Sequence, residues 1–224
     1  MILDTKTEPV ALPPPEILPD YNAAVSGGPS NQRRPTQAPV IYTFSDWAKG
    51  TMLLMPPRSE SPEQRPLYRI TVELDLNPFL PVSYITKVMR CTGDENDMVA
   101  EFAFSLNQKR AVIRLADTAT RLSSVINNIN SSPKHFNWVL GTRLHWDCRT
   151  SLDDGSPLCI CSLPGKPQRN GTRAQDIQIA SFVPPPIDAS PPLPEATLTI
   201  FPHGHEHMDE ILVSALVVER MLTR

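Results

Sequence analysis

The 224-residue sequence has few glycines, few aromatic residues and no strong excess of either charge. Glycine occurs 9 times, aromatic residues make up 6% of the chain, and the formal net charge at pH 7 is −3. A chain this close to neutral lacks the positive field with which proteins bind nucleic acid, so we expect no nucleic-acid partner. No run of 18 apolar residues occurs either, so we expect no transmembrane segment.

Motifs of common catalytic sites are missing as well. The sequence contains no GxxxxGK[ST] or GxGxxG phosphate loop and no GxSxG nucleophile setting. Asp153 and Asp154 precede Gly155, which is typical of a turn rather than of two catalytic carboxylates. Trp47, Trp138 and Trp146 are expected in the core or at its rim. We therefore expect a non-enzymatic protein without a cofactor.

The cysteines and the first residues bear on the compartment. The four cysteines are Cys91, Cys148, Cys159 and Cys161. The opening MILDTKTEPVALPPP has neither the basic region nor the apolar core of a secretory signal. Reduced thiols in a cytoplasmic protein, membrane-peripheral if it binds lipid, are therefore expected.

Proline is abundant and clustered, with 25 residues in the chain. Residues 1–39 hold eight prolines and few large apolar side chains, so they cannot bury enough surface to offset their ordering entropy. We predict a disordered proline-rich tail over residues 1–39 and a folded domain over residues 40–224. Residues 56–66 and 184–194 are proline-punctuated loops within that domain.

Alternation of apolar and polar residues predicts eleven short strands. They are expected at residues 40–44, 51–55, 67–76, 82–90, 98–105, 111–115, 135–140, 142–149, 157–163, 176–183 and 196–201. In residues 67–76, Leu67, Val72, Leu74 and Leu76 are expected on the buried side of the strand, opposite the charged residues. Residues 118–130 have apolar side chains at helical spacing, and helix and strand both stay open there.

Residues 209–224 (DEILVSALVVERMLTR) predict a helix with apolar side chains around its whole circumference, although several β-branched residues leave a buried strand as the competing interpretation. Asp209 is expected to cap its N-terminus, and Arg220 suits its last turn. Such a helix must be covered on every side. Many antiparallel strands beside it therefore predict a mainly β fold, an antiparallel β-barrel that encloses a hydrophobic C-terminal α-helix.

Several short pieces of sequence occur in the order of a known family. They are YTF at 42–44, LYRI at 67–70, VAEF at 99–102, FNW at 136–138, WD at 146–147, LTIF at 198–201, MDEILV at 208–213 and VER at 218–220. In these pieces, residues 40–224 resemble an uncharacterised fungal (basidiomycete-type) family of the LURP-one/Tubby C-terminal-like group.

That resemblance implies a barrel of about twelve strands around a hydrophobic C-terminal helix. It also implies a function in binding, because Tubby domains of the group bind phosphoinositides and the related scramblases act at membranes. A membrane phospholipid or a protein is the partner expected on this ground. The resemblance does not place a lipid site on numbered residues here.

Two sets of side chains are candidates for binding. The first set is basic and consists of Arg143, Arg149, Lys166, Arg169 and Arg173. These residues form a patch if loop 165–173 folds near strand 142–149. Such a patch would bind lipid phosphate or an acidic partner, and ordinary solvated charge is the alternative.

The second set is a histidine cluster. His203, His205 and His207 alternate, so in an extended chain their imidazoles share one side and could hold a Zn²⁺ ion. The thiols of Cys159 and Cys161 have the same period and could add ligands. A solvated loop and small core residues are the competing interpretations for the two groups.

Overall fold

The computed structural model describes residues 38–58, 65–77, 79, 82–92, 95–105, 111–165, 175–186, 190 and 193–223. The tail expected at residues 1–39 lies outside this part of the chain except for its last two residues. Structural statements below concern the described residues of the domain that begins after residue 36.

The domain is built on antiparallel β-strands, most of them where alternation predicts them. The strands are β1 (Val40–Phe44), β2 (Thr51–Met55), β3 (Tyr68–Asp75), β4 (Ser83–Thr92), β5 (Glu95–Ser105), β6 (Ala111–Leu115), β7 (Thr118–Arg121), β8 (Ile126–Asn128), β9 (His135–Trp138), β10 (Leu144–Ser151), β11 (Pro157–Leu163), β12 (Ile177–Val183) and β13 (Thr197–Ile200). Each of the eleven predicted strands is present, with ends that differ by a few residues at most.

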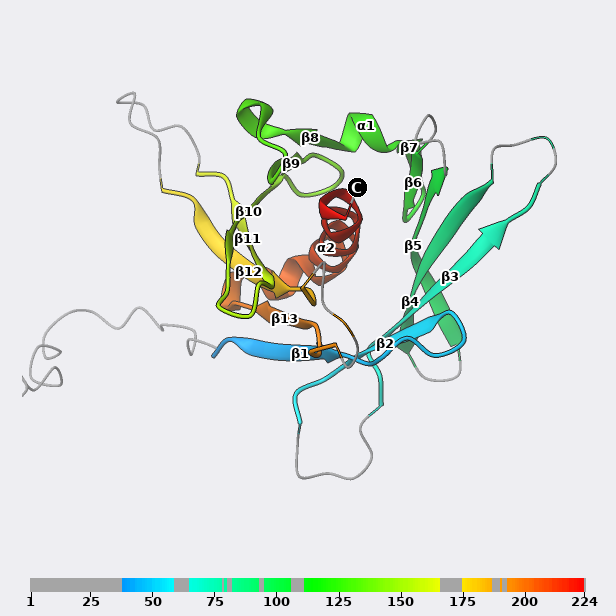
Figure 1. The fold of residues 1–224 in the computed structure, drawn as a ribbon, viewed down its shortest axis with the longest axis horizontal. Helices are drawn as coiled ribbons and strands as arrows, with labels where there is room; N and C mark the ends of the chain where they lie inside the picture. Colours follow the sequence, from blue (N-terminus) through cyan, green and yellow to red (C-terminus); the bar gives the residue numbers. More distant parts are fainter. Residues whose placement is uncertain are drawn as a thin grey trace, which may run out of the picture. The chain divides into compact units, whose positions relative to one another are not determined.

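The thirteen strands form one sheet in the order β7-β6-β5-β4-β3-β2-β1-β13-β12-β11-β10-β9-β8. All neighbours are antiparallel, and β1 joins the two halves by pairing with both β2 and β13. Figure 1 shows the sheet curving around the C-terminal helix. Because β7 and β8 do not pair with each other, the described strands form an open sheet, and the expected closed barrel is not observed.

The ambiguous residues 118–130 explain the open edge, because they are strand and helix in turn. β7 leads into a single helical turn, α1 (Leu122–Val125), which is followed by β8 and a 3₁₀ turn, η2 (Ile129–Ser131). Leu122 and Val125 are buried against the core. The helical turn interrupts the extended chain between β7 and β8, so its residues add no strand pairing at the open edge.

The alternation of β3 was interpreted wrongly at its far end. Tyr68 and Ile70 are buried, but Leu74 and Leu76 are exposed and Val72 is only half-buried. Figure 1 shows this end of the β3–β4 pair reaching away from the helix. The strand continues past the edge of the core, so its last apolar side chains have nothing to pack against.

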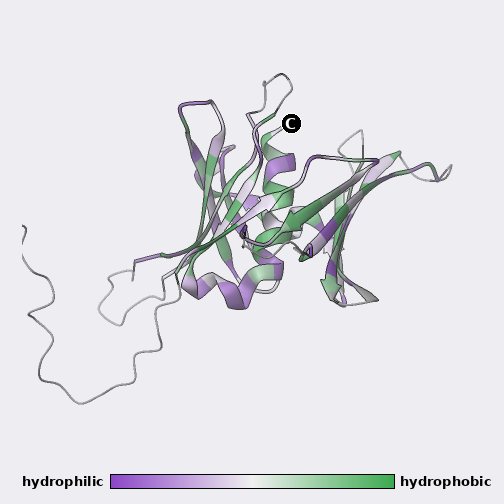
Figure 2. Ribbon diagram, turned by 90° about the horizontal axis from the view of Figure 1, so that it is seen from below, coloured by the Kyte–Doolittle hydropathy of each residue, from purple (hydrophilic) through white to green (hydrophobic). Residues whose placement is uncertain are grey.

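Helix α2 (Met208–Leu222) fills the concave side of the sheet (Figure 1). It comes after all the described strands in the sequence. Its residues 211–218 are buried without interruption, and Figure 2 shows the predominantly hydrophobic colouring of the helix. The expectation of a helix covered on every side is confirmed for this run. None of the described helices has the length and hydropathy needed to cross a membrane.

A polar contact attaches the first turn of α2 to the sheet. The Tyr68 hydroxyl donates to Asp209 Oδ1 at 2.6 Å, and the Arg90 guanidinium forms an ion pair with the same carboxylate. Burial raises the pKa of Tyr68, and Asp209 raises it further. His207 occupies the N-cap position without a side-chain cap. The prediction that Asp209 caps the helix is therefore wrong, because its carboxylate points to β3 and β4 instead.

One buried hydrogen bond lies in the middle of the core. Ser214, on the buried run of α2, accepts a hydrogen bond from Trp146 Nε1 at 3.0 Å and donates to the Ile211 carbonyl oxygen at 3.1 Å. Both side chains are fully buried. A buried indole N–H without an acceptor is costly, so the burial of Trp146 requires the acceptor that Ser214 provides.

We expect Val217→Asp to abolish cooperative unfolding, because an unpaired charge in the core costs several kcal/mol. Val217 is fully buried, whereas Val112 on β6 is 52% exposed. Val112→Asp is therefore the matched control and should change stability by about 0.5 kcal/mol or less. Thermal melts followed by circular dichroism make the comparison. A wild-type-like melt for Val217→Asp would contradict the burial of α2.

We expect Ser214→Ala to destabilise the domain by about 1–3 kcal/mol, although it removes a polar group from the core, because it leaves the Trp146 N–H without an acceptor. In a Trp146→Phe background the same substitution should cost about 1 kcal/mol less. Urea unfolding of the four proteins of this cycle measures the coupling. Equal costs in both backgrounds would show that the hydrogen bond contributes nothing.

Candidate functional site

The histidine cluster adopts a conformation that separates its side chains. Residues Pro202–His207 form a 3₁₀ helix, η3, rather than the extended chain that the metal hypothesis requires. With three residues per turn, alternate side chains point in different directions. Within the described residues no group of three His, Cys, Asp or Glu side chains could hold a metal ion. The geometric premise of a site at His203, His205 and His207 is therefore wrong.

Each part of this segment has a different environment. His203 is exposed, the Nε2 atom of His205 is buried without a hydrogen-bond partner in the described part, and His207 Nδ1 lies 3.1 Å from Thr142 Oγ1. Gly204 is buried so close to β12 that a Cβ atom would lie 2.2 Å from the Ile179 carbonyl oxygen. The glycine allows η3 to pack on the sheet, so it has a structural role.

The cysteines of β10 and β11 belong to the core. Cys148, Cys159 and Cys161 are buried and form no disulfide. Hydrogen bonding to Cys159 and burial raise the pKa of Cys148, and burial raises the pKa of Cys161. Protonated thiols packed among apolar side chains behave as small hydrophobic residues, the competing interpretation given above.

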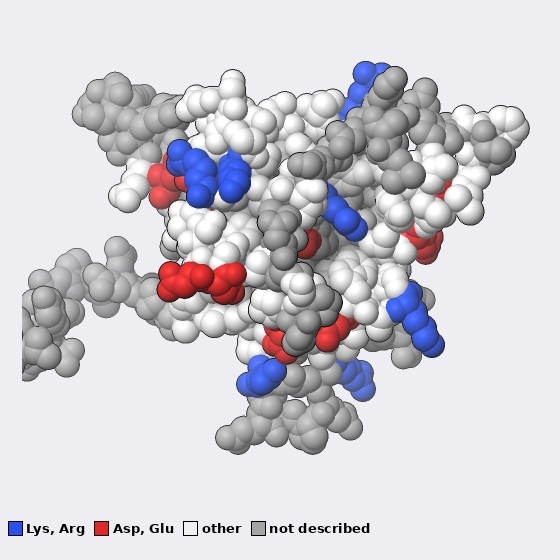
Figure 3. All heavy atoms as spheres, viewed as in Figure 1, with Lys and Arg blue, Asp and Glu red and all other residues white. Residues whose placement is uncertain are grey.

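Of the predicted basic patch, the structure describes only Arg143 and Arg149. Lys166, Arg169 and Arg173 lie outside the described residues. Arg143 precedes β10 and Arg149 lies six residues further along, so their backbones are separated by roughly 20 Å of extended chain. Arg149 also donates to both Asp147 oxygens, at 2.8 and 2.6 Å. On the face seen in Figure 3, cationic and anionic side chains occur in several small separate groups.

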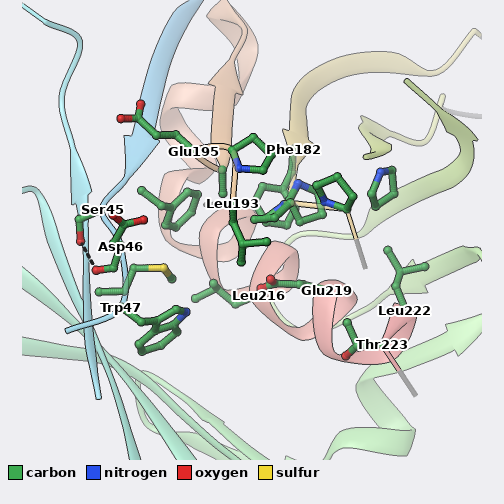
Figure 4. A pocket seen from close by; sticks show the side chains of 18 residues that line it. Ser45, Asp46, Trp47, Phe182, Leu193, Glu195, Leu216, Glu219, Leu222 and Thr223 are labelled. Carbon is green, nitrogen blue, oxygen red and sulfur yellow. Dashed lines mark hydrogen bonds between the residues drawn. The ribbon is translucent and has the colours of Figure 1, made fainter. Parts of the chain in front are cut away.

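An apolar pocket with a volume of about 510 Å³ lies beside the C-terminal half of α2. Four parts of the chain surround it: the β1–β2 hairpin, the start of β11, the proline-rich ends of the β12–β13 connection, and α2. Its lining residues are Phe44, Ser45, Asp46, Trp47, Met52, Pro157, Phe182, Pro184, Pro185, Pro186, Leu193, Pro194, Glu195, Ala196, Leu216, Glu219, Leu222 and Thr223. Figure 4 shows their arrangement.

The floor of this pocket is rigid and apolar. Phe44 and Phe182 are buried with their rings edge to face, at a centroid separation of 5.7 Å. Met52 and Leu216 are buried beside them. Side chains that pack into the core on one side and border the pocket on the other hold its shape without a ligand, which is typical of preformed binding sites.

Trp47 forms part of the rim and is held by the hairpin that carries it. Ala48 and Thr51 exchange backbone hydrogen bonds of 2.9 and 3.0 Å, and Gly50 turns the chain with a φ of +73°. The Gly50 carbonyl oxygen also accepts from the Val72 N–H at 2.8 Å, which ties the turn to β3. Trp47 remains 50% exposed, whereas Trp138 and Trp146 are fully buried. The expectation of core positions is confirmed for Trp138 and Trp146, whereas Trp47 borders the pocket.

Glu219 supplies the polar group that faces the pocket from α2. Figure 4 shows its side chain directed from the helix into the pocket, toward the side on which Trp47 lies. Burial raises the pKa of this carboxyl, and the nearby Arg220 opposes the rise. No other described residue forms a hydrogen bond or salt bridge with the carboxyl. A half-buried acid without a partner is available to a ligand.

A second hollow of about 510 Å³ lies at the other end of α2 and includes Arg90, Asp209 and Glu210. Its lining is more polar, and its central charges already satisfy each other, because Arg90 and Asp209 form the ion pair that holds the helix. A ligand there would have to compete with a contact on which the fold depends. The apolar pocket is therefore the candidate functional site.

Sequence reasoning did not find this pocket. Its walls come from a turn and from proline-rich connections, which have no periodicity. The available signals were the acidic Glu219 at the end of a run of buried residues and a tryptophan in the β1–β2 hairpin.

Comparisons with known proteins identify the family without a function. No curated protein matches the chain, and no solved structure matches it. The sequence model of one family matches residues 56–224, which include eleven of the thirteen described strands, α2 and much of the pocket lining. On that match, the chain belongs to the family of unknown function DUF6593.

Proposed function

We propose that the protein is a non-enzymatic binding module, and that its ligand binds in the apolar pocket beside the C-terminal half of α2. The observation that carries this proposal is the pocket itself, which has a volume of about 510 Å³ and an aromatic and proline-rich lining. Binding sites for small molecules have this size and composition, with a few polar groups that orient the ligand. Glu219 and Asp46 are those groups here.

Phosphoinositide binding remains a prediction from the family resemblance. Arg149 is paired with Asp147, and Arg143 lies at the other end of β10, so the described residues contribute no converging set of cations. The charged side chains around the pocket are carboxylates, which repel phosphate. The described residues therefore support an apolar ligand better than a phosphoinositide headgroup.

We also propose that the chain belongs to the LURP-one/Tubby C-terminal-like group. A single antiparallel sheet that curves around an apolar helix supports it. The gap between β7 and β8 is spanned by one turn of helix, so we propose that the domain functions as a barrel with α1 in place of a strand contact. The compartment proposed is the cytoplasm, in keeping with the free cysteines among the described residues.

We expect a neutral aliphatic probe, decanol, to bind the full chain once and to shift the tryptophan emission to shorter wavelength. Trp47 is the tryptophan that borders the pocket, so Trp47→Phe should remove the shift while calorimetry still detects binding. Leu193, which lines the pocket and is 45% exposed, provides the affinity test. Leu193→Asp should weaken binding by about fivefold to tenfold, because it replaces apolar contact with a charge.

The matched control is Leu152→Asp, because Leu152 is 40% exposed and does not line the pocket. This variant should bind decanol as the wild type does. Thermal melts of both variants show whether they are folded. The proposal fails if decanol shows no saturable binding up to its solubility limit in water, or if both leucine variants lose affinity equally.

A further inference from the structure

The charged side chains that line the apolar pocket all carry the same sign. They are Asp46, on the β1–β2 hairpin, Glu195, before β13, and Glu219, on α2. No lysine, arginine or histidine is among the described lining residues. Three separate parts of the chain therefore direct carboxylates to one apolar hollow, which favours cations within it and repels anions.

We infer that the ligand of this pocket is a small organic cation, an apolar body that carries an ammonium or guanidinium group and pairs with the carboxylate of Glu219. This inference rests on the binding function proposed above and specifies its ligand. It follows from the different situations of the three carboxylates, from the position of Trp47 and from the shape of the apolar floor.

The three carboxylates are not equivalent. Glu195 lies 3.6 Å from the Arg58 guanidinium, and both side chains are largely exposed, so water and a cation already solvate it. Asp46 is exposed as well. Glu219 is half-buried and has no described partner, so its negative charge has lost hydration without compensation. A ligand cation would supply the missing partner, which makes Glu219 the group that gains most from binding.

The nearest protein cation does not already fill this role. Arg220 follows Glu219 in the helix and is exposed, and it lines a smaller cavity of about 90 Å³ rather than the main pocket. Arg220 lowers the pKa of Glu219 by its charge, but burial is the larger effect and leaves the pKa raised. The acid is therefore still short of stabilisation in the free protein.

Trp47 provides a second feature suited to a cation. Its indole borders both the main pocket and the smaller cavity, and Glu219 borders the same two spaces. Half of the Trp47 surface is exposed, so a ligand can reach the ring. Cations bind favourably over the face of an indole, and a carboxylate beside the ring strengthens this attraction.

The rest of the pocket accounts for the apolar body. Phe44, Phe182, Met52 and Leu216 form a floor without charge, and prolines form the wall opposite α2. A flexible chain or ring of drug-like size would be largely buried in a hollow of about 510 Å³. The pocket thus has an apolar region for the body and an acidic, aromatic region for the charged end.

Three probes with the same ten-carbon chain test the inference: decylamine, decanol and decanoate, each below its aggregation concentration. Isothermal titration calorimetry with the full chain measures each dissociation constant. We expect decylamine to bind about tenfold more tightly than decanol, and decanoate to bind most weakly. Equal affinity for decylamine and decanol would overturn the inference.

The matched variants are Glu219→Gln and Glu195→Gln. Glu219→Gln should bring the decylamine affinity within about threefold of the decanol affinity, whereas Glu195→Gln should change the ratio of the two affinities by less than about twofold. Equal effects of the two variants on decylamine would also overturn the inference. If Glu219→Gln does not fold, the comparison of the three probes on the wild type decides alone.

The failures of the two proposals are distinguishable. If decanol binds the wild type and Leu193→Asp weakens it, the binding function stands whatever the order of the three probes. If none of the probes binds, the function proposed for the pocket is wrong, and the inference about its ligand is wrong with it.

Discussion

The burial of residues 211–218 of α2 is the constraint on which the rest of the structure depends. A helix covered on every side needs apolar partners around its whole circumference, and an antiparallel sheet supplies them only if it curves. β1 completes the curve by pairing with β13 on one side and β2 on the other. The pocket begins where this burial ends, because after Val218 the helix carries Glu219 and the covering strands are replaced by a hairpin turn and prolines.

Much of this fold can be predicted from sequence because two physical signals are strong. Alternation identifies half-buried strands such as β10, whose apolar residues are buried and whose polar residues between them are not. An uninterrupted apolar run identifies α2. Both signals are local, and each reflects what one element buries. They do not specify which strands pair at the sheet edges, so they could not indicate that β7 and β8 leave the described sheet open.

The candidate site could not be predicted for the same reason. Its residues come from positions as far apart as 44 and 223, and most lie in turns and proline segments without a repeating pattern. The histidines were more conspicuous, but their alternation matters only in an extended chain, and η3 is helical. Asp209 had the identity of a capping residue, yet a hydroxyl and a guanidinium from β3 and β4 determine where its carboxylate points.

The position of α2 after all thirteen strands has a consequence for biosynthesis. As the chain leaves the ribosome, the strands emerge before the helix that covers their apolar faces. The contact between Tyr68 and Asp209 spans 141 residues, so it forms only after almost the whole domain has been synthesised. Strands adjacent in sequence can pair as they emerge, but their apolar faces stay uncovered for seconds at ordinary elongation rates, and the β1–β13 pairing waits for the last strand. We therefore expect the nascent chain to need protection by chaperones during translation.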